Sequence, residues 1–121
     1  MSIPFVYDRE ANVIRSTCNE DLSDKDIREY FSELLAKKNE ISGADEYVDF
    51  TRVQRFDSSH AEFARIKHLY ETLSDEKVVV RTVFKVGNSH QYGMARMYSG
   101  LVEMTGNTFG FEFDGWEPDE E

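Results

Sequence analysis

The sequence predicts a single α/β domain built on a mixed, mostly parallel sheet with helices packed on it, and three observations support this. The chain has 121 residues, the length of one domain. Apolar residues make up 40% of it and include nine Phe, six Tyr and one Trp, enough to fill one core. Segments with the spacing of strands and of helices alternate along the chain, and strands separated by helices pair in parallel through right-handed crossovers.

The chain is expected to open as a β-hairpin. Residues 3–7 and 13–18 are rich in β-branched and aromatic side chains. The polar segment 8–12 between them has the length of a hairpin loop. The two strands therefore form an antiparallel pair, which we expect at one edge of the sheet.

A first helix is expected to begin after Ser23. Serine is a common N-cap, Asp26 stands at the third helical position, and Leu22 precedes the cap where it can pack against Ile27. The apolar residues that follow recur every three or four positions and share one helix face: Ile27, Tyr30, Phe31, Leu34 and Leu35.

A short strand and a second helix are expected next. Gly43 interrupts the chain before a strand at residues 47–50. Asp57 or Ser58 is expected to cap the helix that follows. The apolar face of this helix carries Phe63, Ile66, Tyr70 and Leu73.

The last part of the chain predicts a central strand, a third helix and a final strand. Residues 78–84 form a nearly continuous β-branched run, typical of a strand covered on both faces. A helix over residues 89–105 follows, with Gly106 placed as its C-terminal cap. Its apolar face carries Met94, Tyr98, Leu101 and Val102. The final strand has one exposed face, and on its other face lie Phe109, Phe111 and Phe113.

The expected order is therefore two strands followed by three helix–strand pairs, with the helices crowding one face of the sheet. Residues 1–113 are assigned to the domain and residues 114–121 to an acidic C-terminal tail.

The charge of the chain limits its partners. Fourteen basic and 24 acidic residues give a formal charge of −10. This excess argues against nucleic-acid binding, which needs a basic face, and no apolar run approaches the ~20 residues of a membrane span. The charge is uneven, because residues 51–101 carry eight basic and five acidic side chains while both ends are acidic. The middle of the chain is therefore compatible with an acidic partner or a phosphate.

The sequence lacks patterns typical of catalysis or metal binding. Cys18 is the single cysteine, so no disulfide forms within the chain, which fits a cytoplasmic protein. The histidines show no metal-ligand spacing, and neither a nucleophile elbow nor a phosphate-binding glycine loop occurs. We therefore expect a non-enzymatic protein without a metal or a cofactor.

One local pattern stands out, in the polar segment between the strand at residues 47–50 and the second helix. It holds two arginines, three typical capping residues and a histidine: Arg52, Arg55, Asp57, Ser58, Ser59 and His60. In an open α/β sheet this is the carboxyl edge, where ligands meet helix N-termini. Helix capping alone accounts for the serines. The alternative is that Ser58 or Ser59 accepts a phosphate, about two negative charges, on a surface where the other four residues contact a partner or an anion.

These residues carry a resemblance to a known family. The element order over residues 3–113, the Val48-Asp49-Phe50 strand and the Phe56-Asp57-Ser58-Ser59 segment resemble the STAS domain of the SpoIIAA-like anti-sigma-factor antagonists. In that family a hydrophobic-Asp-Ser-Ser-Gly segment opens this helix, and its first serine is phosphorylated by a partner kinase that is itself the anti-sigma factor. The resemblance implies that Ser58 is the phosphoacceptor, with His60 standing where the family has glycine. The segment Tyr92-Gly93-Met94-Ala95-Arg96-Met97 is also similar to a branch of uncharacterised bacterial SpoIIAA-like proteins, grouped with STAS and Sec14-type lipid-binding folds.

The third helix offers an alternative function. Tyr92, Met94, Met97 and Tyr98 either pack as core or line a pocket for a small apolar or lipid-like ligand. Arg96 lies between the two methionines and has no acidic residue four positions away, so it either contacts an anion or a partner or is solvated. The sequence thus predicts a cytoplasmic regulatory or protein-interaction module, with ligand binding and homodimer formation as alternatives.

Overall fold

The computed structural model describes residues 3–57, 60–102 and 108–118. In chain order, the elements within these residues are β1 (Phe5–Asp8), β2 (Val13–Thr17), β3 (Asp21–Ser23), α1 (Asp24–Ala36), β4 (Ala44–Asp49), β5 (Arg55–Asp57), α2 (His60–Asp75), β6 (Val79–Val86), α3 (Ser89–Val102) and β7 (Thr108–Phe113). The expected succession of elements is confirmed, with two short strands, β3 and β5, in addition.

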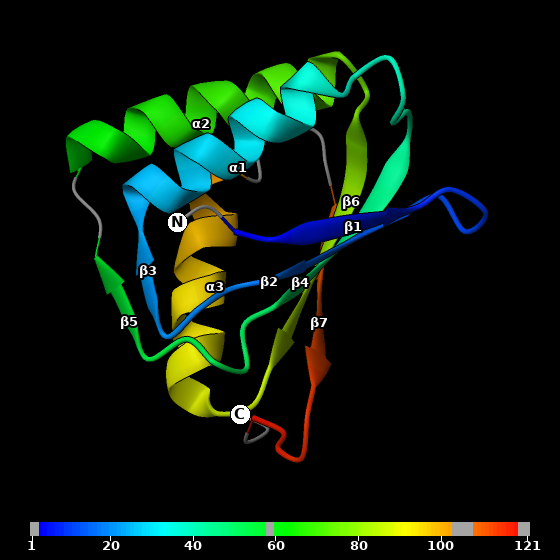
Figure 1. Cartoon of the computed structure of the whole chain (residues 1–121). Coiled ribbons are helices and arrows are strands. Elements are labelled where there is room, and N and C mark those ends of the chain that lie inside the picture. Colours follow the sequence, from blue (N-terminus) through cyan, green and yellow to red (C-terminus); the bar gives the residue numbers. More distant parts are fainter. Residues whose placement is uncertain (1–2, 58–59, 103–107, 119–121) are drawn as a thin grey trace.

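The main sheet has five strands in the order β1-β2-β4-β6-β7. Strands β1 and β2 are antiparallel, and every later neighbouring pair is parallel. Each new strand of the main sheet is added on the same side of the strand before it, from β1 to β7. Since the crossovers between parallel strands are right-handed, all three helices lie on one face of the sheet, as Figure 1 shows. The predicted mixed, mostly parallel sheet with a hairpin at one edge and helices on one face is therefore confirmed.

Helix α1 begins as predicted. The Oγ of Ser23 accepts a hydrogen bond from the Asp26 backbone N–H at 3.3 Å, and the Asp26 carboxylate accepts one from the Ser23 N–H at 3.2 Å. This reciprocal pair satisfies two backbone donors that a helix start leaves open. Four residues of the predicted face are at most 5% exposed, namely Ile27, Tyr30, Phe31 and Leu34.

The expectation that the strand after α2 is covered on both faces is met only in its middle. Thr82 and Phe84 face the helices and are 1% and 2% exposed; on the opposite face Val83 is 6% exposed but Arg81 is exposed. A register shift at the start of the β4–β6 pair leaves Val80 42% exposed. A β-branched run predicts burial on both faces only where a second layer covers the sheet, and here all three crossovers lie on one side.

A second, two-stranded parallel sheet was not predicted. It pairs β3 with β5 and places Leu22 opposite Phe56. Figure 1 shows it beside α3, away from the edge strand β7. The segment expected as a loop before the second helix therefore contains a strand. Three residues are too few to show the alternation from which a strand is predicted.

Element boundaries differ from the expected ones by a few residues. Strand β4 begins at Ala44, three residues before the strand that was predicted, and β1 begins two residues later than predicted. Three residues of the predicted buried face of α2 are confirmed, since Ile66, Tyr70 and Leu73 are at most 1% exposed, while the side chain of Phe63 lies outside what the structure describes. Asp57, one of the two residues expected to cap this helix, instead ends β5 three positions before the helix begins. The caps expected at Ser58 and Gly106 lie outside the described residues.

The start of the expected acidic tail contacts the sheet and α3. The Asp114 backbone N–H donates to the Val86 carbonyl at 2.9 Å. The Trp116 ring lies 5.6 Å from the Phe113 ring and 5.8 Å from the Tyr92 ring, measured between centroids. These contacts fasten the segment after β7 to the first half of α3.

Candidate functional site

The carboxyl ends of β2, β4 and β6 surround an open surface cleft of about 720 Å³, called here the carboxyl-edge cleft. It is lined by residues 19–21 and 51–54 and by Asn88, His90 and Gln91. Its size is that of ligand sites, which span about 300 to 1,000 Å³. Its position, beyond the carboxyl ends of parallel strands, is where open α/β sheets bind ligands.

Gln91 joins two of the segments around this cleft. Its side chain is 3% exposed, and its Oε1 accepts a hydrogen bond from the Gly87 backbone N–H at 2.7 Å. Its Nε2 donates to the carbonyl oxygens of Thr51 and Val53 at 2.9 and 3.1 Å. A Cβ atom at Gly87 would lie only 3.3 Å from this Oε1, so a residue without a side chain suits the position. The segment after β4 is thereby held against the first turn of α3.

Further hydrogen bonds stabilise the rim of the cleft. Asp49 Oδ1 accepts from the backbone N–H and the Oγ1 of Thr51, at 2.8 and 2.6 Å, and closes the turn after β4. Asn88 Oδ1 accepts a backbone N–H of the first turn of α3 at 2.9 Å and caps this helix. His90 Nε2 lies 3.1 Å from the Gln54 carbonyl oxygen. The rim is therefore braced by the chain's own contacts.

Replacing Gln91 with alanine is expected to lower the free energy of unfolding by about 1 to 3 kcal/mol, because two buried carbonyls and one N–H lose their partner. We also expect faster hydrogen exchange of the backbone amides of residues 51–54, since this segment loses its link to α3. Urea unfolding and native-state exchange measure the two effects. Gln54→Ala removes an exposed glutamine from the same cleft and should change stability by less than about 0.5 kcal/mol. Equal losses in both variants would contradict this role of Gln91.

The three arginines singled out in the sequence lie in different places. Arg52 is exposed and lines the carboxyl-edge cleft. Arg55 lies on β5 and pairs with Asp21 at the rim of the cleft, with 2.7 Å between Nε and Oδ1. Arg96 lies on α3 with its guanidinium carbon 5.7 Å from the centre of the Tyr92 ring. The structure thus places Arg52 on the cleft lining and Arg55 next to it, paired with the lining residue Asp21, whereas neither Arg55 nor Arg96 lines the cleft itself.

The expected phosphoacceptors, Ser58 and Ser59, lie outside the described residues. Asp57 ends β5 and His60 begins α2, so the two serines follow β5 along the chain. The cleft borders the start of β5 at Gln54. Three residues of strand span about 10 Å. Strand β5 therefore separates the carboxyl-edge cleft from the start of α2.

The four side chains expected to form a pocket on the third helix do not converge on one site. Tyr92 packs against three aromatic side chains of β7 and the segment after it, with ring centroids 5.0 to 5.8 Å apart. Met94 is buried at 9% exposure, whereas Met97 is 51% exposed. Of the four, Tyr98 alone lines an internal cavity.

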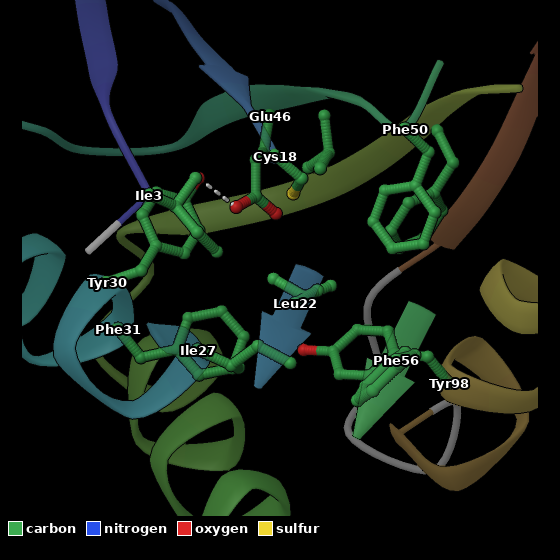
Figure 2. A pocket seen from close by; sticks show the side chains of 12 residues that line it. Ile3, Cys18, Leu22, Ile27, Tyr30, Phe31, Glu46, Phe50, Phe56 and Tyr98 are labelled. Atoms are coloured by element: carbon green, nitrogen blue, oxygen red, sulfur yellow. Dashed lines mark hydrogen bonds between the residues drawn. The ribbon is translucent and has the colours of Figure 1, made fainter. Parts of the chain in front are cut away.

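This internal cavity, called here the core cavity, lies between the main sheet, α1, α3 and the β3–β5 pair (Figure 2). It encloses about 30 Å³ of free space. Its lining is apolar or aromatic except for the Cys18 thiol, the Glu46 carboxyl and the hydroxyls of Tyr30 and Tyr98. Tyr98 is 6% exposed, its Oη has no hydrogen-bond partner, and Figure 2 shows this atom pointing into the cavity.

Glu46 is the buried acid of the core cavity and the centre of a hydroxyl network. It is 2% exposed; the Tyr30 hydroxyl donates to its Oε2, and Thr82 Oγ1 donates to its Oε1 at 2.8 Å. The network continues on both sides, with Ser16 Oγ 3.0 Å from the Tyr30 hydroxyl and Tyr70 Oη 2.8 Å from Thr82 Oγ1. Every oxygen of the Glu46 carboxyl therefore has a neutral hydrogen-bonding neighbour.

Burial controls the protonation of the groups around the core cavity. Loss of water raises the pKa of the Glu46 carboxyl above its ordinary value, and the hydrogen bonds from Tyr30 and Thr82 oppose this rise. Burial, with the neighbouring Glu46 charge as a further cause, also raises the pKa of the Cys18 thiol and that of the Tyr30 phenol. The Cys18 thiol is therefore held in its protonated, unreactive form.

Within residues 3–57, 60–102 and 108–118, no three His, Cys, Asp or Glu side chains are grouped so that they could hold a metal ion. None of the helices in this part of the chain has the length and apolar character needed to cross a membrane.

Two central residues, Gln91 and Glu46, were missed in the sequence, although a signal existed for each. Asn88 and Gln91 stand three positions apart, which is the spacing of a capping residue and a polar partner at a helix start. Glu46 falls on the same side of a strand as Ala44 and Val48, which marks it as facing the core. Neither signal identifies the distant residues that these side chains contact.

Comparison with protein-family models gives no match, and neither does comparison with curated proteins. Among solved structures, the chain is similar to an uncharacterized protein from the DUF3478 family with a SpoIIAA-like fold, from Shewanella loihica PV-4. The TM-score is 0.57 and the sequence identity 17%, over 94% of this chain and 86% of that one. At this identity the similarity shows the fold alone. The chain therefore has a SpoIIAA-like fold, as the resemblance implied.

Proposed function

We propose that this chain is a non-enzymatic, cytoplasmic regulatory module that binds a protein partner over the carboxyl-edge cleft, in the manner of an anti-sigma-factor antagonist. The observation that carries the proposal is the cleft itself, which has a rim braced by Gln91 and lies at the functional edge of a SpoIIAA-like sheet. A braced surface loses little conformational entropy when a partner docks on it.

Arg52 offers an acidic segment of the partner a cation on the cleft lining. It is exposed there beside His90, and the same lining carries Glu20 and Asp21, of which Asp21 is paired with Arg55. Phosphorylation of Ser58 or Ser59, which follow β5 in the chain, would add about two negative charges to this part of the protein. The modification would then weaken the docking of an acidic partner.

Phosphorylation and docking are tested together with candidate anti-sigma-type kinases from the same genome. We expect one of them to modify Ser58 or Ser59, as mapped by mass spectrometry, and to bind the unmodified chain. Arg52→Glu should weaken this binding about tenfold, measured by surface plasmon resonance, because it reverses a charge at the interface.

The matched control is Lys25→Glu, which reverses a highly exposed charge on α1, an element that does not line the cleft. It should change the affinity less than twofold. Absence of any modifying or binding kinase would count against the regulatory function. An equal effect of both charge reversals would count against the carboxyl-edge cleft as the docking site.

A further inference from the structure

We propose that the core cavity binds the ammonium group of a small amine, with the Glu46 carboxylate as its counter-ion and Tyr98 Oη as a hydrogen-bond acceptor. This site is separate from the carboxyl-edge cleft and does not depend on the function proposed for it.

The lining of the cavity has the chemistry that recognises organic cations. Half of the 12 lining residues are aromatic: Tyr30, Phe31, Phe50, Phe56, Phe84 and Tyr98. Aromatic rings attract ammonium groups through their negative faces, and this attraction is strongest where water is excluded. Neither Lys, Arg nor His lines the cavity, so Glu46 meets no cationic side chain there. An anionic ligand would be repelled by Glu46 and would find no basic group.

Tyr98 supplies the independent observation that points to a ligand. A buried hydroxyl without a partner is unfavourable, and native proteins satisfy nearly all such groups. Tyr98 Oη is buried and unpartnered, and it points into the cavity, which the Glu46 carboxyl also lines (Figure 2). An ammonium group in the cavity would donate a hydrogen bond to Tyr98 Oη and be attracted by the charge of Glu46. A purely apolar occupant would leave Tyr98 unsatisfied.

The size of the cavity limits the ligand further. About 30 Å³ of free space is enough to hold a water-sized group, and an ammonium group is of that size. A quaternary ammonium group is too large. Phe56 on β5 is the one lining residue that is half-buried rather than buried, so the carbon stem of a primary amine would leave beside it.

Binding of an ammonium group would favour the ionised form of Glu46. The titratable groups nearest to the carboxyl are Cys18 after β2, Tyr30 on α1 and Tyr98 on α3, with Tyr70 on α2 reached through Thr82. Burial raises the pKa of Cys18, Tyr30 and Tyr98, so these three remain neutral. An arriving ammonium group would therefore be the charge that compensates the carboxylate.

The test is an NMR titration of the isotope-labelled full chain with methylammonium chloride at constant ionic strength. We expect saturable shifts of the Tyr98 and Tyr30 ring signals, with a dissociation constant in the millimolar range, and tighter binding as pH rises and Glu46 gives up its proton more readily. Methanol, the neutral molecule of nearly the same shape, should give no saturable shift.

Two variants separate the roles of the polar groups. Glu46→Gln keeps the shape of the side chain but not its charge, and should weaken methylammonium binding at least tenfold. Tyr98→Phe keeps the ring and should weaken it several-fold. Glu112→Gln removes an exposed carboxylate from β7 and should leave the affinity unchanged.

Three results would overturn the proposal. Equal binding of methanol and methylammonium would make the cavity a site for neutral molecules. Undiminished binding by Glu46→Gln or Tyr98→Phe would remove the proposed partners. Shifts confined to exposed acidic side chains, or none up to about 100 mM probe, would show that amines do not enter the cavity.

Discussion

Replacing Phe84 with alanine is expected to lower the free energy of unfolding by about 3 to 5 kcal/mol. Phe84 is 2% exposed and stands at the centre of an aromatic cluster. Its ring centroid lies 5.4 Å from Phe50, 5.9 Å from Tyr98, 6.0 Å from Phe111 and 6.4 Å from Phe109. Because Phe84 also lines the core cavity, its removal would enlarge an existing void, which surrounding side chains cannot close without leaving their own contacts.

Urea unfolding of wild type and variant at one pH measures this loss. The slope of the free energy of unfolding against urea concentration should be the same for both proteins, which shows that both expose the same surface on unfolding. Val80→Ala is the matched control because it truncates an apolar residue of the same strand that is 42% exposed. It should cost less than about 1 kcal/mol. Similar losses from the two substitutions would show that Phe84 is not a centre of the core.

The stability difference between wild type and Glu46→Gln is expected to change with pH. Burial raises the pKa of Glu46, so the folded chain holds this proton more tightly than the unfolded chain does. The resulting stabilisation is fully present below the ordinary carboxyl pKa of 4.5 and is lost as pH rises through the pKa of the folded state. Wild type should therefore lose stability relative to the variant on going from acid to neutral pH, by at most about 1.4 kcal/mol per pH unit.

Urea unfolding of both proteins at several pH values from 4 to 8 measures this difference directly. Comparing the two proteins at each pH cancels the titration of all other carboxyl groups. Glu112→Gln serves as the control, because it removes a carboxylate of the same type from an exposed position. Unfolding curves of wild type and Glu46→Gln that stay equally separated over this range would show that Glu46 does not couple stability to protonation.

Much of the fold followed from the sequence. The Ser23–Asp26 cap and the buried face of α1 depend on residues three or four positions apart, and these were predicted correctly. The parallel sheet with all helices on one side follows from alternating elements and the right-handedness of crossovers. The position of Arg52 at the carboxyl edge of the sheet followed from its place after a strand.

The candidate sites were decided by the tertiary structure. Glu46 receives hydrogen bonds from Tyr30, 16 residues before it, and from Thr82, 36 residues after it. Gln91 reaches the carbonyls of Thr51 and Val53, 40 and 38 residues away. The local sequence therefore determined the elements and their order, because caps and periodicities act over about four residues. Only the packed fold decided which polar side chains are buried together, because those contacts join residues brought close by the crossovers between strands.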